Sequence, residues 1–170
     1  MTYSTYGQVE PNHLSGQATK EIYAQLPAEI DVQNGMFLCY NQAEGKITVP
    51  SATSMEPMLA FSEVKVYGAR ETEADFYIPA NSDVYPRFIK TKVGDTITTN
   101  VVSKTGAAGA IVVADTDDLP AAKDVLVVAA NGTLVPEGDA LAVYTAMQWT
   151  VVKVYTMPDG TPGIKIQRTL

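Results

Sequence analysis

The densest group of potential metal ligands in this sequence is the acidic run Asp115-Thr116-Asp117-Asp118. Carboxylates spaced this closely on one loop are a ligand type that Ca²⁺ accepts. The run lacks the later glycine and the bidentate glutamate that complete an EF-hand loop. We therefore interpret residues 115–118 as a solvated acidic loop, with calcium binding as the less favoured alternative, and we predict no metal site and no cofactor.

The residues that usually perform catalysis are scarce. The chain contains one histidine, His13, and one cysteine, Cys39. A histidine-based triad or a multi-histidine zinc site is therefore close to excluded. There is no phosphate-binding glycine loop, dinucleotide fingerprint, CxxC or HExxH motif, and no carboxylate pair for glycosidic cleavage stands out among the 19 acids. We predict that the protein is not an enzyme.

Cys39 lies in the apolar run from Met36 to Tyr40. A cysteine in such surroundings usually behaves as a small buried hydrophobe and not as a reactive thiol. A single cysteine also excludes an internal disulfide. We expect Cys39 to be a core residue.

Aromatic side chains offer the other kind of chemistry, which is the stacking of a sugar ring on an exposed platform. The candidates are Tyr40, Tyr67, Tyr77, Tyr85, Tyr144 and Trp149. Our preferred interpretation is that most of these rings pack in the core or against neighbours across strands. A row of them on one exposed face would instead indicate a carbohydrate-binding module.

Charge and hydropathy limit the classes of molecule that we expect this protein to bind. The net charge is -7 and the 12 cationic residues are scattered singly, which argues against a phosphate backbone as ligand. No apolar run approaches the roughly 20 residues that span a bilayer. The first residues lack both a basic start and an apolar stretch, so we expect no signal peptide and synthesis in a cytoplasm. We predict neither nucleic acid nor membrane as a partner.

The elements that would carry any site are predicted to be strands, and the clearest is a hairpin from Leu141 to Gln167. β-Branched and aromatic residues fill its first half, and the sequence Pro158-Asp159-Gly160 favours a turn. After the turn, isoleucines alternate with polar residues, and this two-residue period is typical of a strand with one solvent-exposed face. Before it, valines occur on both faces, which predicts a strand covered on both sides.

Further short strands are predicted between glycine and proline turns. Their predicted ranges are 36–40, 46–49, 58–67, 87–92, 96–102, 110–114 and 125–129. We also expect one helical turn after Asp118. Short strands at this spacing are typical of a sandwich or a small barrel. The predicted fold class is mainly β, with a compact β-barrel or sandwich, an extended N-terminal arm and one short helix.

The start of the chain shows no hydrophobic period. We expect residues 1–16 to form an arm that is loose in the isolated protein, although a simply disordered terminus is an alternative. A short helix should follow from Ser15 and end at Pro27, which cannot continue it. This assigns residues 1–30 to the arm and residues 31–170 to a β domain, which one interpretation divides into sub-lobes 31–92 and 93–170.

Three segments carry a resemblance to a known group of proteins: Asn34 to Tyr40, Glu63 to Tyr67, and Val93 to Asn100. In these turn-plus-strand pieces, and in layout over residues 30–170, the chain resembles the head decoration or capsid-stabilising proteins of tailed bacteriophages. The resemblance implies a non-enzymatic virion protein. It would be made in the cytoplasm of a host bacterium and would bind the outer surface of the capsid.

The same resemblance implies that the partner is the major capsid protein, whose neighbouring subunits the protein would bridge. It also implies self-association, with a trimer favoured over a dimer or monomer. We expect the arm to make the capsid contacts by adding a strand to a capsid sheet. Its candidate contact residues are Tyr3, Tyr6, Leu14, Ile22 and Tyr23. If so, deleting residues 1–26 would leave the β domain folded and abolish capsid binding.

Two other functions remain as alternatives at this point. The first is a carbohydrate-binding or adhesion module of a phage fibre or tail tip. The second is another virion part, such as a tail-tube or head-completion protein, which would form rings instead of coating a shell.

Overall fold

The structure is a computed structural model that describes residues 6–18, 22–23, 25–62, 77–104, 112–113, 115–158 and 160–170. Antiparallel strands dominate it and its helices are short, as the sequence predicted. In chain order the elements are β1 (Val9–His13), α1 (Ser15–Ala18), β2 (Ile22–Tyr23), β3 (Val32–Gln33), β4 (Phe37–Asn41), β5 (Lys46–Thr48), β6 (Met58–Ala60), β7 (Tyr77–Ile78), β8 (Phe88–Ile89), β9 (Thr96–Thr99), η2 (Thr116–Asp118), β10 (Val125–Ala129), β11 (Leu134–Pro136), β12 (Ala142–Thr156) and β13 (Pro162–Arg168).

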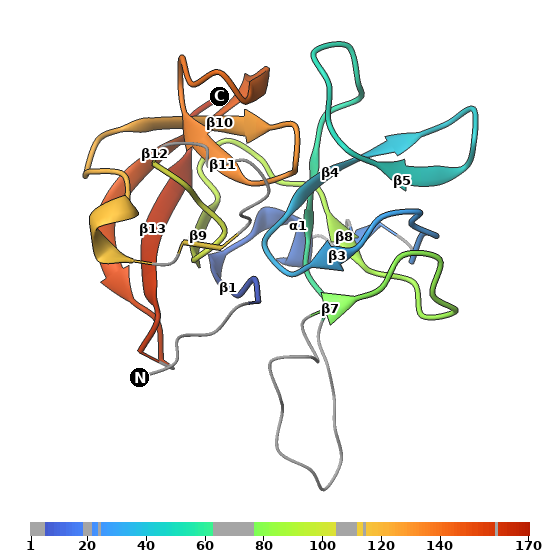
Figure 1. The fold of residues 1–170 in the computed structure, drawn as a ribbon, viewed down its shortest axis with the longest axis horizontal. Coiled ribbons are helices and arrows are strands. Elements are labelled where there is room, and N and C mark those ends of the chain that lie inside the picture. Colours follow the sequence, from blue (N-terminus) through green and yellow to red (C-terminus); the bar gives the residue numbers. More distant parts are fainter. Residues whose placement is uncertain are drawn as a thin grey trace, which may run out of the picture.

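A six-stranded sheet forms one side of the molecule, with the strand order β1-β9-β13-β12-β10-β11 (Figure 1). This sheet curls back on itself. The chain just after β9 reaches β11, where Val102 and Leu134 form a parallel bridge and the Ser103 amide donates to the Leu134 carbonyl at 2.9 Å. Strands β9, β13, β12, β10 and β11 therefore close a small barrel, which is one of the two architectures predicted.

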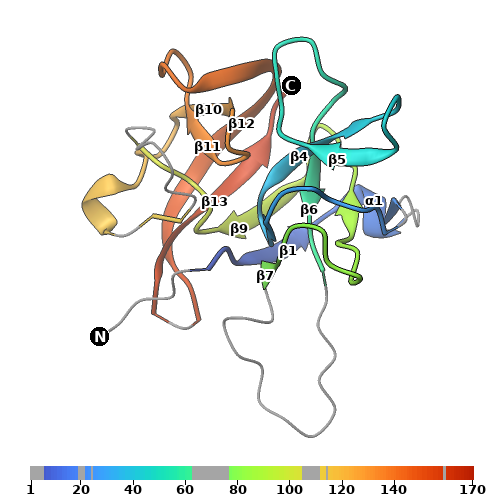
Figure 2. The same cartoon turned by 45° about the vertical axis from the view of Figure 1, so that its right-hand side comes forward.

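A five-stranded sheet of order β2-β8-β6-β4-β5 and the pair β3-β7 form the other side. Figure 2 shows β4, β5 and β6 beside the barrel strands after a 45° turn. All strands from β2 to β8 belong to this side, and β9 to β13 belong to the barrel. The chain thus passes from one side to the other between Ile89 and Thr96, while β1 joins the barrel from the opposite end of the sequence.

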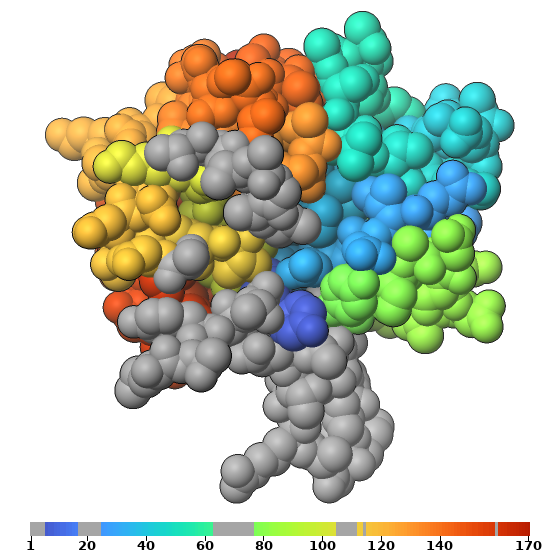
Figure 3. Space-filling view, in the orientation of Figure 1, coloured from blue at the N-terminus to red at the C-terminus, as the bar shows by residue number. Residues whose placement is uncertain are grey.

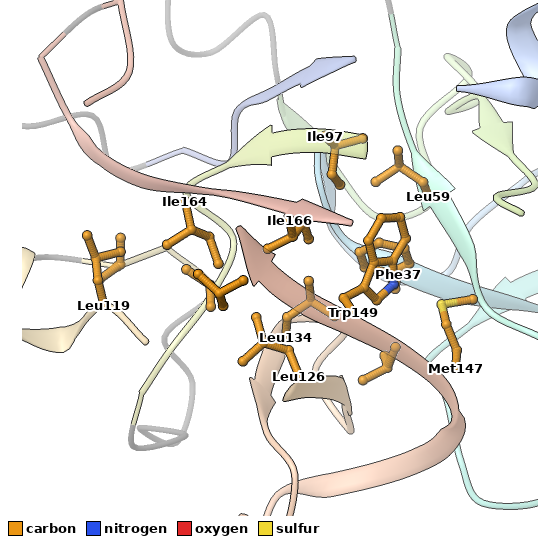
Figure 4. Packing of buried hydrophobic residues seen from close by; sticks show 14 of the residues in the cluster. Phe37, Leu59, Ile97, Leu119, Leu126, Leu134, Met147, Trp149, Ile164 and Ile166 are labelled. Carbon is orange, nitrogen blue, oxygen red and sulfur yellow. The ribbon is translucent and has the colours of Figure 1, made fainter. Parts of the chain in front are cut away.

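One hydrophobic core joins the two sides. Trp149 of the barrel is fully buried, and its ring centroid lies 5.4 Å from that of Phe37 in β4 (Figure 4). Leu59 from the second sheet and Ile97 and Ile166 from the barrel belong to the same buried cluster. Because the cluster draws on both sheets, the two sides are stabilised by the same buried apolar surface.

The C-terminal hairpin is present as predicted. Trp149 and Val151 of β12, and Ile164 and Ile166 of β13, are at most 1% exposed. The expectation that β12 is covered on both faces is wrong at its turn end, because Val152 and Val154 are 47% and 49% exposed. The ladder shifts between Val151 and Lys153, so Val152 is an extra residue with no partner on β13.

The N-terminal expectation needs correction. Val9–His13 is a strand that pairs with β9 over Val9↔Thr99 to His13↔Thr96, and is not a free arm. The helix that we expected up to Pro27 is described over Ser15–Ala18, and it ends before Ile22–Tyr23, which is a strand that pairs with Ile89 and Phe88 of β8. Two sheet edges were available to this segment, and strand pairing satisfies more of its backbone than a marginal helix would.

Other strand predictions hold where the structure describes them. Residues 36–49 form the predicted hairpin, and β8, β9 and β10 lie within their predicted ranges. The predicted strand 58–67 is described only as far as residue 62, and of the predicted strand 110–114 only residues 112–113 are described, without strand structure. The helical turn begins at Thr116, before Asp118 and not after it.

Candidate functional site

Of the five predicted contact residues, the structure describes the side chains of Tyr6 and Leu14. Tyr3 lies outside the described residues. Leu14 is 4% exposed and belongs to the shared core, so its side chain is not on a free surface. Ile22 and Tyr23 are in β2. Tyr6 is half-buried, and its ring centroid lies 5.8 Å from that of Tyr77.

Asn100, which is fully buried after β9, fixes the segment that carries Tyr6. Its Oδ1 accepts from the Gln8 amide at 2.7 Å, and its Nδ2 donates to the Tyr6 carbonyl at 3.1 Å. On the other side, the Gly7 amide donates to Oε1 of Gln33 at 2.7 Å. Residues 6–8 are therefore held between the barrel and β3, which makes this segment part of the fold.

Strand β1 lies at the edge of its sheet. The Asn100 amide donates to Gln8 across the ladder, so the alternation of an antiparallel pair directs the backbone groups of Val9 and Pro11 away from β9. Proline has no amide to offer a further strand, and its presence on an edge is a recognised device against strand addition. This position weakens the idea that the N-terminal segment docks by adding a strand to another protein.

The turn end of the β12–β13 hairpin is a better interaction surface. We define the hairpin surface as Val152, Lys153, Val154, Tyr155 and Lys165. The two valines are about half exposed, at 47% and 49%. In Figures 1 and 2 this end of the hairpin extends beyond β9 at the lower left of the barrel. Exposed apolar side chains next to charged ones are a common feature of protein–protein contacts.

Two lysines lie at the same end of the hairpin, on the opposite face from Val154. Lys153 and Lys165 are directly opposite each other in the ladder, and Nζ of Lys153 lies 5.5 Å from the centre of the Tyr155 ring. Like charges at directly opposite positions destabilise a strand pair. In a chain of net charge -7 they create a local positive spot, which suits an acidic partner surface.

A polar hollow lies on the other side of the molecule, between the β4–β5 hairpin and the loop 51–55. Its volume is about 350 Å³. We define the polar hollow by its lining residues, which are Cys39, Tyr40, Asn41, Gln42, Ala43, Thr48, Val49, Ser51, Thr53, Ser54 and Met55. In Figure 3 the two walls are at the upper right, with the hairpin in cyan and the loop in teal.

Cys39 lies at the base of the polar hollow and is 1% exposed. Its Sγ is 3.2 Å from Oγ of Ser54 and donates to the Met55 carbonyl at 3.1 Å. Burial raises the pKa of the thiol, and the hydrogen bond with Ser54 opposes this shift. The thiolate is therefore disfavoured, which agrees with the expected role of a small core residue.

The acidic run is a capped turn. Asp115 precedes η2, and its Oδ1 accepts from the Asp117 amide at 3.3 Å and the Thr116 hydroxyl at 3.1 Å. The Asp117 amide, first among several hydrogen bonds, holds the pKa of Asp115 below its usual value. Among the described residues, no three or more histidine, cysteine or acidic side chains are grouped so that they could hold a metal ion. His13, at the end of β1, is exposed.

Two buried charged side chains, Arg168 and Asp95, connect segments that are far apart in the sequence. Arg168 of β13 is 7% exposed, and its Nη1 donates to Oε1 of Glu56 at 2.6 Å and to the carbonyl and hydroxyl of Thr91. Asp95 is fully buried, and its Oδ1 accepts from the amide and hydroxyl of Ser15 at 3.0 and 2.6 Å. Both groups are satisfied by hydrogen bonds, which is the arrangement expected of structural charges.

Sequence reasoning missed both surfaces, although one had a readable signal. Between the register shift and the turn, from Lys153 to Thr156, the partners are spaced equally about position 159, so counting outward from the turn would have placed Lys153 opposite Lys165. The polar hollow had no such signal, because its two walls come from separate loops.

No helix in the described part of the chain is long and apolar enough to cross a bilayer.

Comparisons with known proteins add no relative. No protein family, no curated protein and no solved structure matches this chain.

Proposed function

We propose that this protein is a non-enzymatic structural protein of a tailed-phage virion, which binds the outer surface of the capsid and bridges major capsid protein subunits. The observation that carries this proposal is the hairpin surface. There Val152 and Val154 are each about half exposed, and Lys153 stands opposite Lys165. Val154, paired with Ile164, is on the other face of the hairpin from the two lysines, so a partner would hold the turn end on both faces. The resemblance of the chain to head decoration proteins supplies the partner.

The hairpin surface replaces the N-terminal segment as the contact that we propose. Apolar side chains provide affinity when they leave water, and the lysine pair directs them to an acidic patch. A protein that binds the assembled shell but not the free subunits stabilises the shell by mass action. Many weak copies on one capsid would act together in this way.

The test is sedimentation of the purified protein with and without empty expanded heads of tailed phages from the same source. We expect saturable co-sedimentation at a fixed number of copies per head, and that number gives the symmetry position and the oligomeric state. A trimer at local threefold positions is the favoured arrangement. Absence of binding to heads would overturn the proposal.

A charge-reversal variant tests the surface itself. We expect Lys153→Glu/Lys165→Glu to weaken binding about tenfold or more at low salt, since an attractive charge becomes repulsive. The matched control is Lys92→Glu/Lys104→Glu, which has the same net charge and alters two exposed lysines outside the hairpin. Equal loss in both variants would show that total charge, and not the hairpin surface, governs binding.

An apolar variant separates packing from charge. Val152→Ser/Val154→Ser should also weaken binding, whereas Val84→Ser/Val93→Ser, at positions 63% and 66% exposed, should not. Circular dichroism of each variant checks that the fold is kept. Unchanged binding of the hairpin variant would remove these valines from the proposed contact.

A further inference from the structure

The polar hollow differs in chemistry from the rest of this charged surface. None of its lining residues is charged, although 18% of the chain is. Seven of them carry neutral groups that form hydrogen bonds: Tyr40, Asn41, Gln42, Thr48, Ser51, Thr53 and Ser54. Such a lining suits a ligand that is polar but uncharged.

The polar hollow also offers apolar surface. Val49 and Met55, on opposite walls, are 46% and 44% exposed, and Tyr40, which also packs against the core cluster that contains Ile47, is half-buried. A sugar ring presents hydroxyl groups around its rim and C–H groups on its faces. Aromatic and aliphatic side chains next to amides and hydroxyls match both features of such a ring.

We propose that the polar hollow binds a neutral saccharide. The ring would lie against Tyr40, with Val49 and Met55 at its edges, while the amide of Gln42 and the hydroxyls of Ser51 and Thr53 would bind its hydroxyl groups. The side chains of Gln42, Ser51 and Thr53 are exposed, so they are within reach of a ligand from solvent. This binding is independent of the proposed attachment to a capsid, since the hairpin surface belongs to the barrel.

The geometry allows more than one sugar unit. A smaller hollow of about 110 Å³ shares Tyr40, Gln42 and Met55 with the first and continues to Glu56, Met58 and Lys90. Charged groups appear only in this second part. We therefore expect a disaccharide to bind more tightly than a monosaccharide, with its second unit hydrogen-bonded by Glu56 or Lys90.

Glycan-array screening of the full chain, followed by amide NMR titration with neutral mono- and disaccharides, tests this proposal. The expected result is binding of at least one neutral glycan, with shifts confined to residues 39–43, 48–49 and 51–56 and, for a disaccharide, also Met58 and Lys90. Absence of binding across the neutral glycans of the array would overturn the proposal, and so would shifts that fall elsewhere.

Variants decide whether the polar hollow is responsible. Gln42→Ala/Thr53→Ala, at two exposed positions, should weaken binding about tenfold, because hydrogen bonds to the ligand are lost. Gln25→Ala, at an exposed glutamine away from the hollow, should bind as the unaltered protein does. Equal affinity in all three proteins would overturn the assignment. The capsid assay on Gln42→Ala/Thr53→Ala should remain normal, so the two proposals fail separately.

Discussion

Gly7 lies so close to Asn34 that a side chain at position 7 would collide with it. A Cβ atom on Gly7 would be 2.3 Å from the carbonyl oxygen of Asn34 and 2.8 Å from Cγ2 of Val101. The carbonyl belongs to the backbone of the turn before β4, so it cannot move aside as a flexible side chain would. Position 7 is where the N-terminal segment passes between the two sides of the molecule.

We predict that Gly7→Ala lowers the free energy of unfolding by about 2–3 kcal/mol or more and releases residues 6–8 from their site. Denaturant unfolding measures the first effect, and limited proteolysis of the N-terminal segment measures the second. Gly94→Ala is the control, because its Cβ would meet nothing within 4 Å although its φ is +98°. It should cost backbone strain without exposing the N-terminus, and an equally protected N-terminus in Gly7→Ala would contradict the close approach.

Replacing Asn100 should lower the free energy of unfolding about as much as replacing a core residue. Its amide group satisfies both the Gln8 amide and the Tyr6 carbonyl, and alanine would leave these backbone groups without their partner. We predict that Asn100→Ala costs about 1–3 kcal/mol of stability and speeds hydrogen exchange at Gln8. Asn12→Ala, at an exposed asparagine that accepts only from the Thr98 hydroxyl among the described contacts, should cost less. Equal losses of stability in Asn100→Ala and Asn12→Ala would mean that the hydrogen bonds of Asn100 with Gln8 and Tyr6 contribute little.

These contacts explain why the N-terminal segment was misjudged from sequence. Glu10 pairs with Thr98, so the strand depends on a partner far along the chain, and Pro11 within it argues against a strand. The sequence around Leu14 shows no hydrophobic periodicity that would identify it as a core residue. Removing residues 1–26 would delete β1 and Leu14, so we no longer expect the rest to fold unchanged.

The C-terminal hairpin was predictable because its signals are local. Ile164 and Ile166 alternate with polar residues, and the turn beside them is encoded by proline and glycine. The exposure of Val152 was not predictable, since a register shift depends on how both strands fit the barrel. The polar hollow likewise depends on loops that meet only in the folded protein.

In the ion pair between Arg168 and Glu56, replacing the arginine should lower stability more than replacing the glutamate. The Arg168 side chain is 8% exposed and that of Glu56 is 50% exposed. Arg168 also donates to the carbonyl and hydroxyl of Thr91, so its removal leaves two buried groups without this donor. We predict that Arg168→Ala costs about 2–3 kcal/mol, because the buried groups of Thr91 lose their donor, whereas Glu56→Gln costs about 1 kcal/mol or less, because the glutamine oxygen still accepts from Arg168.

Thermal unfolding of both variants measures this difference. Glu29→Gln is a control for a surface pair, since Glu29 and Lys46 form an ion pair in which both side chains are well exposed. It should behave as Glu56→Gln does. A large cost for Glu56→Gln would show that the carboxylate, and not the arginine network, holds this end of β13.

Cys39 should make the protein less stable at alkaline pH. Burial raises the pKa of its thiol above the ordinary value of 9.0, so the folded protein keeps the proton at a pH where the unfolded chain has lost it. The unfolded state then binds fewer protons, and stability falls as the pH rises above 9.0. The contribution of the thiol is fully present below that pH.

Comparing the unaltered protein with Cys39→Ala isolates this effect. The pKa of Tyr77, hydrogen-bonded to Asp31, is also raised, and its contribution is the same in the two proteins and cancels. The pKa of Tyr144 is raised first by burial and in smaller part by the charge of Cys39, so Cys39→Ala also removes that smaller part, which acts in the same direction as the thiol itself. We predict that the free energy of unfolding falls more steeply above pH 9.0 in the unaltered protein than in Cys39→Ala. Parallel curves would mean that the thiol ionises as readily in the folded protein as in the unfolded chain, which its burial beneath the polar hollow does not permit.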